Sequence, residues 1–165
     1  MRSFAKMTLM ASALSLVTAT AALAQPAAIN VSISPDFAAD AAKLGERDVN
    51  EQVADLTRQV ERTLNNSDAL DGAVINLVIT DLKPNRPTMQ QLTDRPGLDS
   101  MRSLSVGGAA VEGDVTLADG TKQDVKFKYY STDIRDAVGA AIWTDANRAY
   151  SRLARNLAEG RFVTR

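Results

Sequence analysis

The side chains in this sequence that could carry out chemistry are carboxylates, lysines, tyrosines and serines, because its 165 residues include no histidine and no cysteine. Histidine is the commonest general base and metal ligand near neutral pH, and only cysteine supplies a thiolate nucleophile. The sequence therefore excludes serine–histidine–aspartate catalysis, histidine-bound metals and thiol chemistry. We predict no catalytic site, no metal site and no cofactor.

Two short patterns nevertheless have the composition of catalytic groups. Glu112 and Asp114 are two residues apart in a predicted strand, so both lie on one face and could act as an acid–base pair. Lys126 and Lys128 of the next strand would neutralise them, which favours a structural role. The Ser-x-x-Lys pattern of serine acyl enzymes occurs at 3–6, but inside a targeting segment, where it is a chance match. A small hydrolase or lyase that uses carboxylate or lysine is the alternative to a binding protein.

The segment 83–102, with the sequence KPNRPTMQQLTDRPGLDSMR, is the main candidate binding site. It connects two predicted strands, and connections in compact domains are usually only ~4–6 residues long. Three of the five prolines lie in it, which reduces the entropy lost when it is ordered. Thr88 is a candidate N-cap for one helical turn that supplies two apolar anchors. The candidate contact residues are Lys83, Arg86, Met89, Leu92, Arg95 and Arg102.

The arginines of this segment could bind another envelope protein or an anionic envelope component. The alternative is that 83–102 only covers an open edge of the sheet. A weaker second candidate is the basic stripe of Arg148, Arg152 and Arg155, which share one side of a predicted helix and could meet phosphate, carboxylate or anionic lipid. Cations near a helix C-terminus also simply complement the helix dipole. The single tryptophan, Trp143, is expected to fill the core.

The first two dozen residues have the pattern of a secretory signal peptide. Arg2 and Lys6 form a basic start, 7–23 is uncharged and mostly apolar, and Ala-Leu-Ala at 22–24 is a cleavage pattern. We predict a signal peptide at 1–24 and a single domain at 25–165, located in the periplasm or secreted. An uncleaved anchor is the alternative, but the segment is short and diluted by small residues. Without cysteine to carry lipid, no stable membrane insertion is expected after cleavage.

The charge balance argues against a nucleic-acid partner. The predicted signal peptide holds two of the 19 basic residues and none of the 20 acidic ones, so the mature chain would carry a net charge of −3. A net acidic domain lacks the positive field that nucleic-acid binding requires.

Apolar periodicity predicts the elements that must position these residues. We expect strands at 29–33 and 73–82, and a helix at 46–64 that starts at Gly45 or Asp48. The 73–82 strand is apolar on both faces, with Leu82 on the face opposite Ile75, and is therefore expected to be central. A final helix is predicted from 132 or 133 to 159, stopped by Gly160, with a split at Trp143 as the alternative.

Strands at 103–117 and 122–130 are predicted to form a hairpin, because Asp-Gly at 119–120 separates two alternating runs. The expected pairs are Val115–Val125, Gly113–Phe127, Val111–Tyr129, Asp114–Lys126 and Glu112–Lys128. A shift by two residues would place Asp114 opposite Asp124, which electrostatics disfavours. Gly107-Gly108 predicts a bend or bulge, with close approach of another group as the alternative.

These elements predict an α+β two-layer sandwich, a mainly antiparallel four-stranded sheet with two helices on one face in the order βαβββα. The order is similar to that of small exported domains of bacterial cell envelopes that act in assembly or scaffolding, an analogy of architecture alone. We therefore predict a soluble, non-catalytic binding or assembly protein of the envelope.

Overall fold

The computed structural model describes residues 25–67 and 69–163. The predicted signal peptide at 1–24, with its Ser-x-x-Lys pattern, lies outside these residues. Within the described ranges, no helix combines the length and the apolar character that crossing a bilayer requires.

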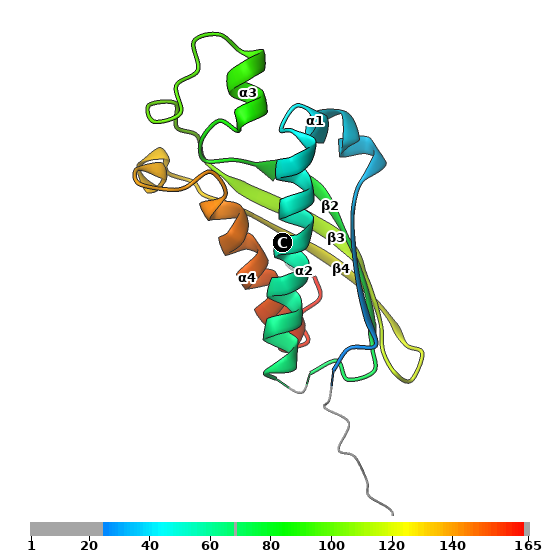
Figure 1. The fold of residues 1–165 in the computed structure, drawn as a ribbon. Helices are drawn as coiled ribbons and strands as arrows, with labels where there is room; N and C mark the ends of the chain where they lie inside the picture. The colour runs from blue at the N-terminus through cyan, green and yellow to red at the C-terminus, as the bar shows by residue number, and fades with distance from the viewer. Residues whose placement is uncertain (1–24, 68, 164–165) are drawn as a thin grey trace, which may run out of the picture.

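The fold is α+β, with a four-stranded mixed sheet and four helices (Figure 1). The strands, in sheet order, are β1 (Ala28–Ile33), β2 (Val74–Lys83), β3 (Gly108–Thr116) and β4 (Lys122–Tyr130). The helices are α1 (Ala38–Ala42), α2 (Glu46–Asn65), α3 (Met89–Asp94) and α4 (Thr144–Ala158), with 3-10 turns at Pro35–Phe37 and Ile134–Ala137.

Three parts of the predicted architecture need correction. β1 pairs with β2 in parallel, whereas β2–β3 and β3–β4 are antiparallel, so the sheet is mixed. The parallel pair is possible because α1 and α2 return the chain across the sheet before β2 begins. The count of two helices and the order βαβββα omit α1 and α3, since only one helical turn was predicted where α3 lies and α1 is only five residues long.

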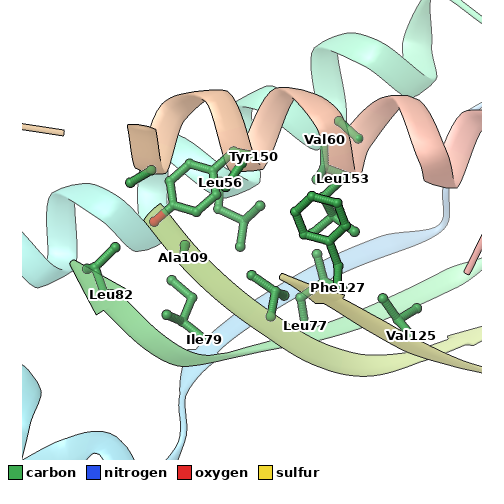
Figure 2. Packing of buried hydrophobic residues seen from close by; sticks show 14 of the residues in the cluster. Leu56, Val60, Leu77, Ile79, Leu82, Ala109, Val125, Phe127, Tyr150 and Leu153 are labelled. Atoms are coloured by element: carbon green, nitrogen blue, oxygen red, sulfur yellow. The ribbon is translucent and has the colours of Figure 1, made fainter. Parts of the chain in front are cut away.

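The core lies between the sheet and the two long helices, α2 and α4 (Figure 1). Leu56 and Val60 of α2 meet Tyr150 and Leu153 of α4 above the sheet, and all four side chains are buried (Figure 2). Each helix carries one apolar stripe, so burying that stripe also fixes which side of the helix faces solvent. Trp143 is buried at the start of α4 and donates a hydrogen bond from Nε1 to Asp48 Oδ1 at 3.1 Å, as expected of a core residue.

β2 is the central strand that its apolar character predicted, but one of its residues changes face. The β2–β3 register shifts between Ile79 and Asp81, which leaves Thr80 as an extra residue. A single inserted residue reverses the alternation of the side chains that follow it. Leu82 therefore turns into the core with Ile79 instead of lying on the opposite face (Figure 2).

The predicted hairpin register is wrong by two residues. Val111 pairs with Phe127, Glu112 with Lys126 and Asp114 with Asp124. The turn decides this register: Gly120 adopts φ 84°, and Leu117 N donates to Thr121 O at 2.8 Å, which closes a three-residue loop at 118–120. In this register Glu112 pairs with Lys126 and not with Lys128 as predicted, and Lys126 Nζ lies 2.8 Å from Glu112 Oε1.

The last predicted helix is split at Trp143, as the alternative interpretation allowed, because a short loop follows the 3-10 turn before α4 begins. Its end is a Schellman motif around Gly160, which has φ 70°. Gly160 N donates to Leu157 O at 3.1 Å and Arg161 N to Asn156 O at 2.8 Å. The chain then turns back to β4, where Lys126 N donates to Phe162 O at 2.9 Å.

Candidate functional site

The long connection between β2 and β3 is anchored to α4 by a buried polar pair. Asn85 Nδ2 donates to Asp145 Oδ2 at 2.5 Å, and Asp145 N donates to Asn85 Oδ1 at 2.9 Å. Gly107 N adds a third hydrogen bond to Asp145 Oδ2 at 3.3 Å, and Arg148 Nη1 pairs with Asp145 Oδ1 at 2.9 Å. Both Asn85 and Asp145 are fully buried, so this connection has one fixed conformation at its base.

Gly107 and Gly108 are required by close approach, the alternative that the sequence left open. A Cβ atom on Gly107 would lie 2.6 Å from Asn85 Oδ1, and one on Gly108 would lie 2.2 Å from Tyr129 O. β3 consequently begins at Gly108, five residues after the predicted start of the strand.

Arg86 holds the connection together rather than presenting a free cation. Its Nε donates to Ala140 O at 2.6 Å, and its Nη1 donates to Ser100 O at 3.3 Å and to Met101 O at 2.7 Å. These bonds join the 83–102 segment to the loop before α4. A backbone hydrogen bond from Asn85 N to Ile142 O, 2.7 Å long, reinforces the same junction.

The predicted helical turn is the full helix α3, and Thr88 caps it. Gln91 N donates to Thr88 Oγ1 at 3.3 Å while Thr88 N donates to Gln91 Oε1 at 3.1 Å, a complete capping box. Met89 is 72% exposed, so it does not pack α3 against the fold, and its role as a contact residue stays a prediction. Leu92 is half-buried. The cap, rather than apolar contact, therefore stabilises α3.

A hollow of about 320 Å³ lies beneath the connection, and Lys83, Arg86 and Arg95 line it. Met89, Leu92 and Arg102 are not among its lining residues. The structure thus gathers three of the six predicted contact residues around one hollow.

Exposed apolar side chains concentrate at this end of the molecule. Of the six large apolar residues that are exposed in the described part of the chain, five come from the loops 84–107 and 131–143. They are Met89, Met101, Val106, Ile134 and Val138. Because Arg86 and Asn85 bind the two loops together, these residues belong to one end of the fold, which we call the apolar end (Figure 1).

The loop 131–143 is the part of this end that sequence reasoning missed. It was predicted to be helical, whereas the structure makes it a loop in which Ile134 and Val138 are 48% and 72% exposed. Gly139, with φ 79°, was the available signal against a continuous helix.

The arginines of the second predicted site, the basic stripe of α4, have different contacts in the structure. Arg148 pairs with the buried Asp145, as described above. The guanidinium of Arg152 lies over the ring of Tyr129, 4.1 Å from its centre. Arg152 and Arg155 line a hollow of about 370 Å³ that shares no residue with the hollow beneath the long connection. The two candidate sites are therefore separate.

The carboxylates considered for acid–base chemistry have structural partners. Asp114 accepts a hydrogen bond from Asn76 at 3.1 Å and lies 3.4 Å from Lys122 Nζ, and Glu112 pairs with Lys126. A further cluster joins Asp81 to Tyr130, whose hydroxyl donates to Asp81 Oδ2 at 2.6 Å. Burial, and then this hydrogen bond, raise the pKa of Tyr130, so its hydroxyl remains protonated at neutral pH.

Groups of three or more potential metal-ligating side chains are absent from the described residues. Comparisons of this chain with protein-family models, with curated proteins and with solved structures gave no match.

Proposed function

We propose that this chain is an exported, non-catalytic binding protein of the bacterial cell envelope that docks another envelope protein with its apolar end. The observation that carries the proposal is that Met89, Met101, Val106, Ile134 and Val138 are all exposed on two loops that are hydrogen-bonded to each other. Soluble monomers rarely expose large apolar side chains together, and such groups mark protein interaction surfaces.

The chemistry of this end fits a protein partner. Methionine adapts its shape to irregular surfaces, and two of the five exposed residues are methionines. Arg95 and Arg102 are exposed on the same connection and provide a polar rim of the kind that surrounds apolar interface centres.

The rigidity of the connection also supports docking. A loop that is already ordered loses less conformational entropy when it binds a partner. The buried Asn85–Asp145 pair, the Arg86 bonds and the capped α3 order the connection.

The proposal is tested by capture of partners from the periplasm of cells that express the tagged full chain. The variant Met89→Asp/Met101→Asp places two charges on the apolar end, and Asn66→Asp, at an exposed position where α2 ends, is the matched control. We expect one partner to be recovered by the wild type and the control but lost from the double variant, and to bind again when both proteins are purified. Equal recovery by all three chains would remove the proposal.

A further inference from the structure

A basic hollow lies where α4, β4 and the segment after α4 meet. It is on a different surface from the apolar end. We call it the arginine hollow; Lys128, Tyr129, Arg152, Arg155, Asn156 and Arg161 are among the residues that line it. Its volume is about 370 Å³. A second hollow of about 280 Å³ on the exposed side of α4 shares Arg152 and Arg155 with it.

The walls of the arginine hollow are fixed by the fold. The Schellman motif turns the chain at Gly160, and the backbone bond between Lys126 and Phe162 holds the following segment against β4. Arg161 Nη2 then donates to Asn156 Oδ1 at 2.8 Å, which closes one wall. Arg152 is held over the ring of Tyr129 by a cation–π contact.

The positive charge in the arginine hollow is only partly neutralised. Arg161 pairs with Glu159, but the ion pairs formed among residues 25–67 and 69–163 include none with Lys128, Arg152 or Arg155. Arg152 and Arg155 are three residues apart on α4, so they are neighbours on the helix surface. Unneutralised cations held side by side repel each other, and an anion between them removes that repulsion.

We infer that the arginine hollow binds a small soluble molecule that carries a phosphate group. Guanidinium groups match the geometry of phosphate oxygens with paired N–H donors. Three unneutralised cations suit a dianion better than a carboxylate, which carries a single charge. A membrane surface fits less well, because Arg152 and Arg155 line a concavity that is only about 370 Å³ in size.

The test is a titration of the full-length protein followed by amide NMR, with inorganic phosphate as the probe and acetate at equal ionic strength as the carboxylate comparison. Arg152→Gln/Arg155→Gln removes two cations, and Arg62→Gln on the exposed side of α2 is the matched control. We expect phosphate to shift the resonances of α4 and β4 and to bind about tenfold more weakly to the double variant. The control should match the wild type, and all three chains should have the same circular dichroism.

Three outcomes would overturn the inference: acetate binding as tightly as phosphate, phosphate affinity unchanged in the double variant, or resonances that shift only outside the hollow. Co-sedimentation with phosphatidylglycerol vesicles separates the sources of phosphate. If the protein bound these vesicles but not inorganic phosphate, the inferred soluble ligand would be wrong and the hollow would instead bind a lipid surface. None of these outcomes bears on partner binding at the apolar end.

Discussion

Asn85 and Asp145 lie 60 residues apart in the chain and exchange two hydrogen bonds in the interior, from Asn85 Nδ2 to Asp145 Oδ2 and from Asp145 N to Asn85 Oδ1. This pair joins the connection that follows β2 to the first turn of α4. It therefore fixes the apolar end relative to the helical layer, and the orientation of the proposed docking surface depends on it.

Replacing Asn85 by alanine should lower the free energy of unfolding by about 3 kcal/mol, because it leaves the buried Asp145 N–H without its partner and removes one of the two hydrogen bonds to Asp145 Oδ2. Urea unfolding measures this change. Asn50→Ala, at an exposed position in α2, is the control and should change stability by less than about 0.5 kcal/mol. A loss for Asn85→Ala no larger than that of the control would show that the pair does not anchor the connection.

Removal of the hydroxyl group should change the free energy of unfolding in opposite directions at two tyrosines, Tyr150 and Tyr130. Tyr150 Oη is buried without a hydrogen-bond partner among the described residues, so Tyr150→Phe should raise the free energy of unfolding by about 1 kcal/mol. Tyr130 Oη donates to Asp81, so Tyr130→Phe should lower it by about 1 kcal/mol. Thermal or urea unfolding of both variants provides the comparison, and equal changes of the same sign would contradict the assigned contacts.

Tyr130 also predicts how stability depends on alkaline pH. Burial and the Asp81 hydrogen bond raise its pKa in the folded state above the ordinary value of 10.0. Below pH 10 neither the folded nor the unfolded chain ionises this group, so its contribution is constant. Above pH 10 the folded state holds more protons than the unfolded state, and the free energy of unfolding falls as pH rises.

The same urea series run at pH 9, 10 and 11 checks this sign. The wild type should lose stability between pH 10 and 11 more steeply than Tyr130→Phe. Identical slopes for the two chains would show that Tyr130 ionises as readily when folded as when unfolded.

Gly113 should tolerate no side chain, because a Cβ atom there would lie 2.0 Å from Asn76 O on the neighbouring strand. Gly113→Ala is expected to cost more than about 3 kcal/mol of unfolding free energy, the sum of backbone strain and overpacking. Gly97→Ala is the matched control, since Gly97 has φ 98° but no atom within 4 Å of the added Cβ. The control should cost only about 1 kcal/mol. Equal costs at the two sites would mean that backbone conformation alone explains Gly113.

Local signals in the sequence were enough to predict several elements of this fold. Thr88 predicted the cap of α3, Gly160 predicted the end of α4, and the apolar stripe of 46–64 predicted α2. Each of these predictions uses residues that are close together in the sequence, or a repeat of apolar residues every three to four positions.

Features that depend on distant residues were not accessible in the same way. The parallel pairing of β1 is decided by the path of the chain through α1 and α2, and the position of Leu82 by a bulge at Thr80. The hairpin register was missed for a different, local reason: it follows the backbone of the turn at Gly120, which outweighs the charge pairs used to predict it.

The sequence predicted the candidate site as a segment, and its role in binding stays a prediction. Lys83, Arg86 and Arg95 line one hollow, but the structural role of Arg86 depends in part on the carbonyl group of Ala140, which lies 54 residues further along the chain. The exposure of Met89 could not be predicted from its place in α3, because the burial of so short a helix depends on which other segments of the chain pack against it. The exposed apolar residues of 131–143 were missed because the sequence there has a helical pattern of apolar residues, although Gly139 interrupts it.

Site-specific photo-crosslinking in living cells of the organism that encodes the chain tests the proposed docking surface most directly. A photoreactive residue would replace Met89, Met101 or Val138 at the apolar end, and Arg62 on α2 or Asn66 directly after it as controls. We predict one adduct of the same mass from all three apolar-end positions and none from the controls. No adduct from the apolar end, or the same adducts from every position, would contradict docking through this surface.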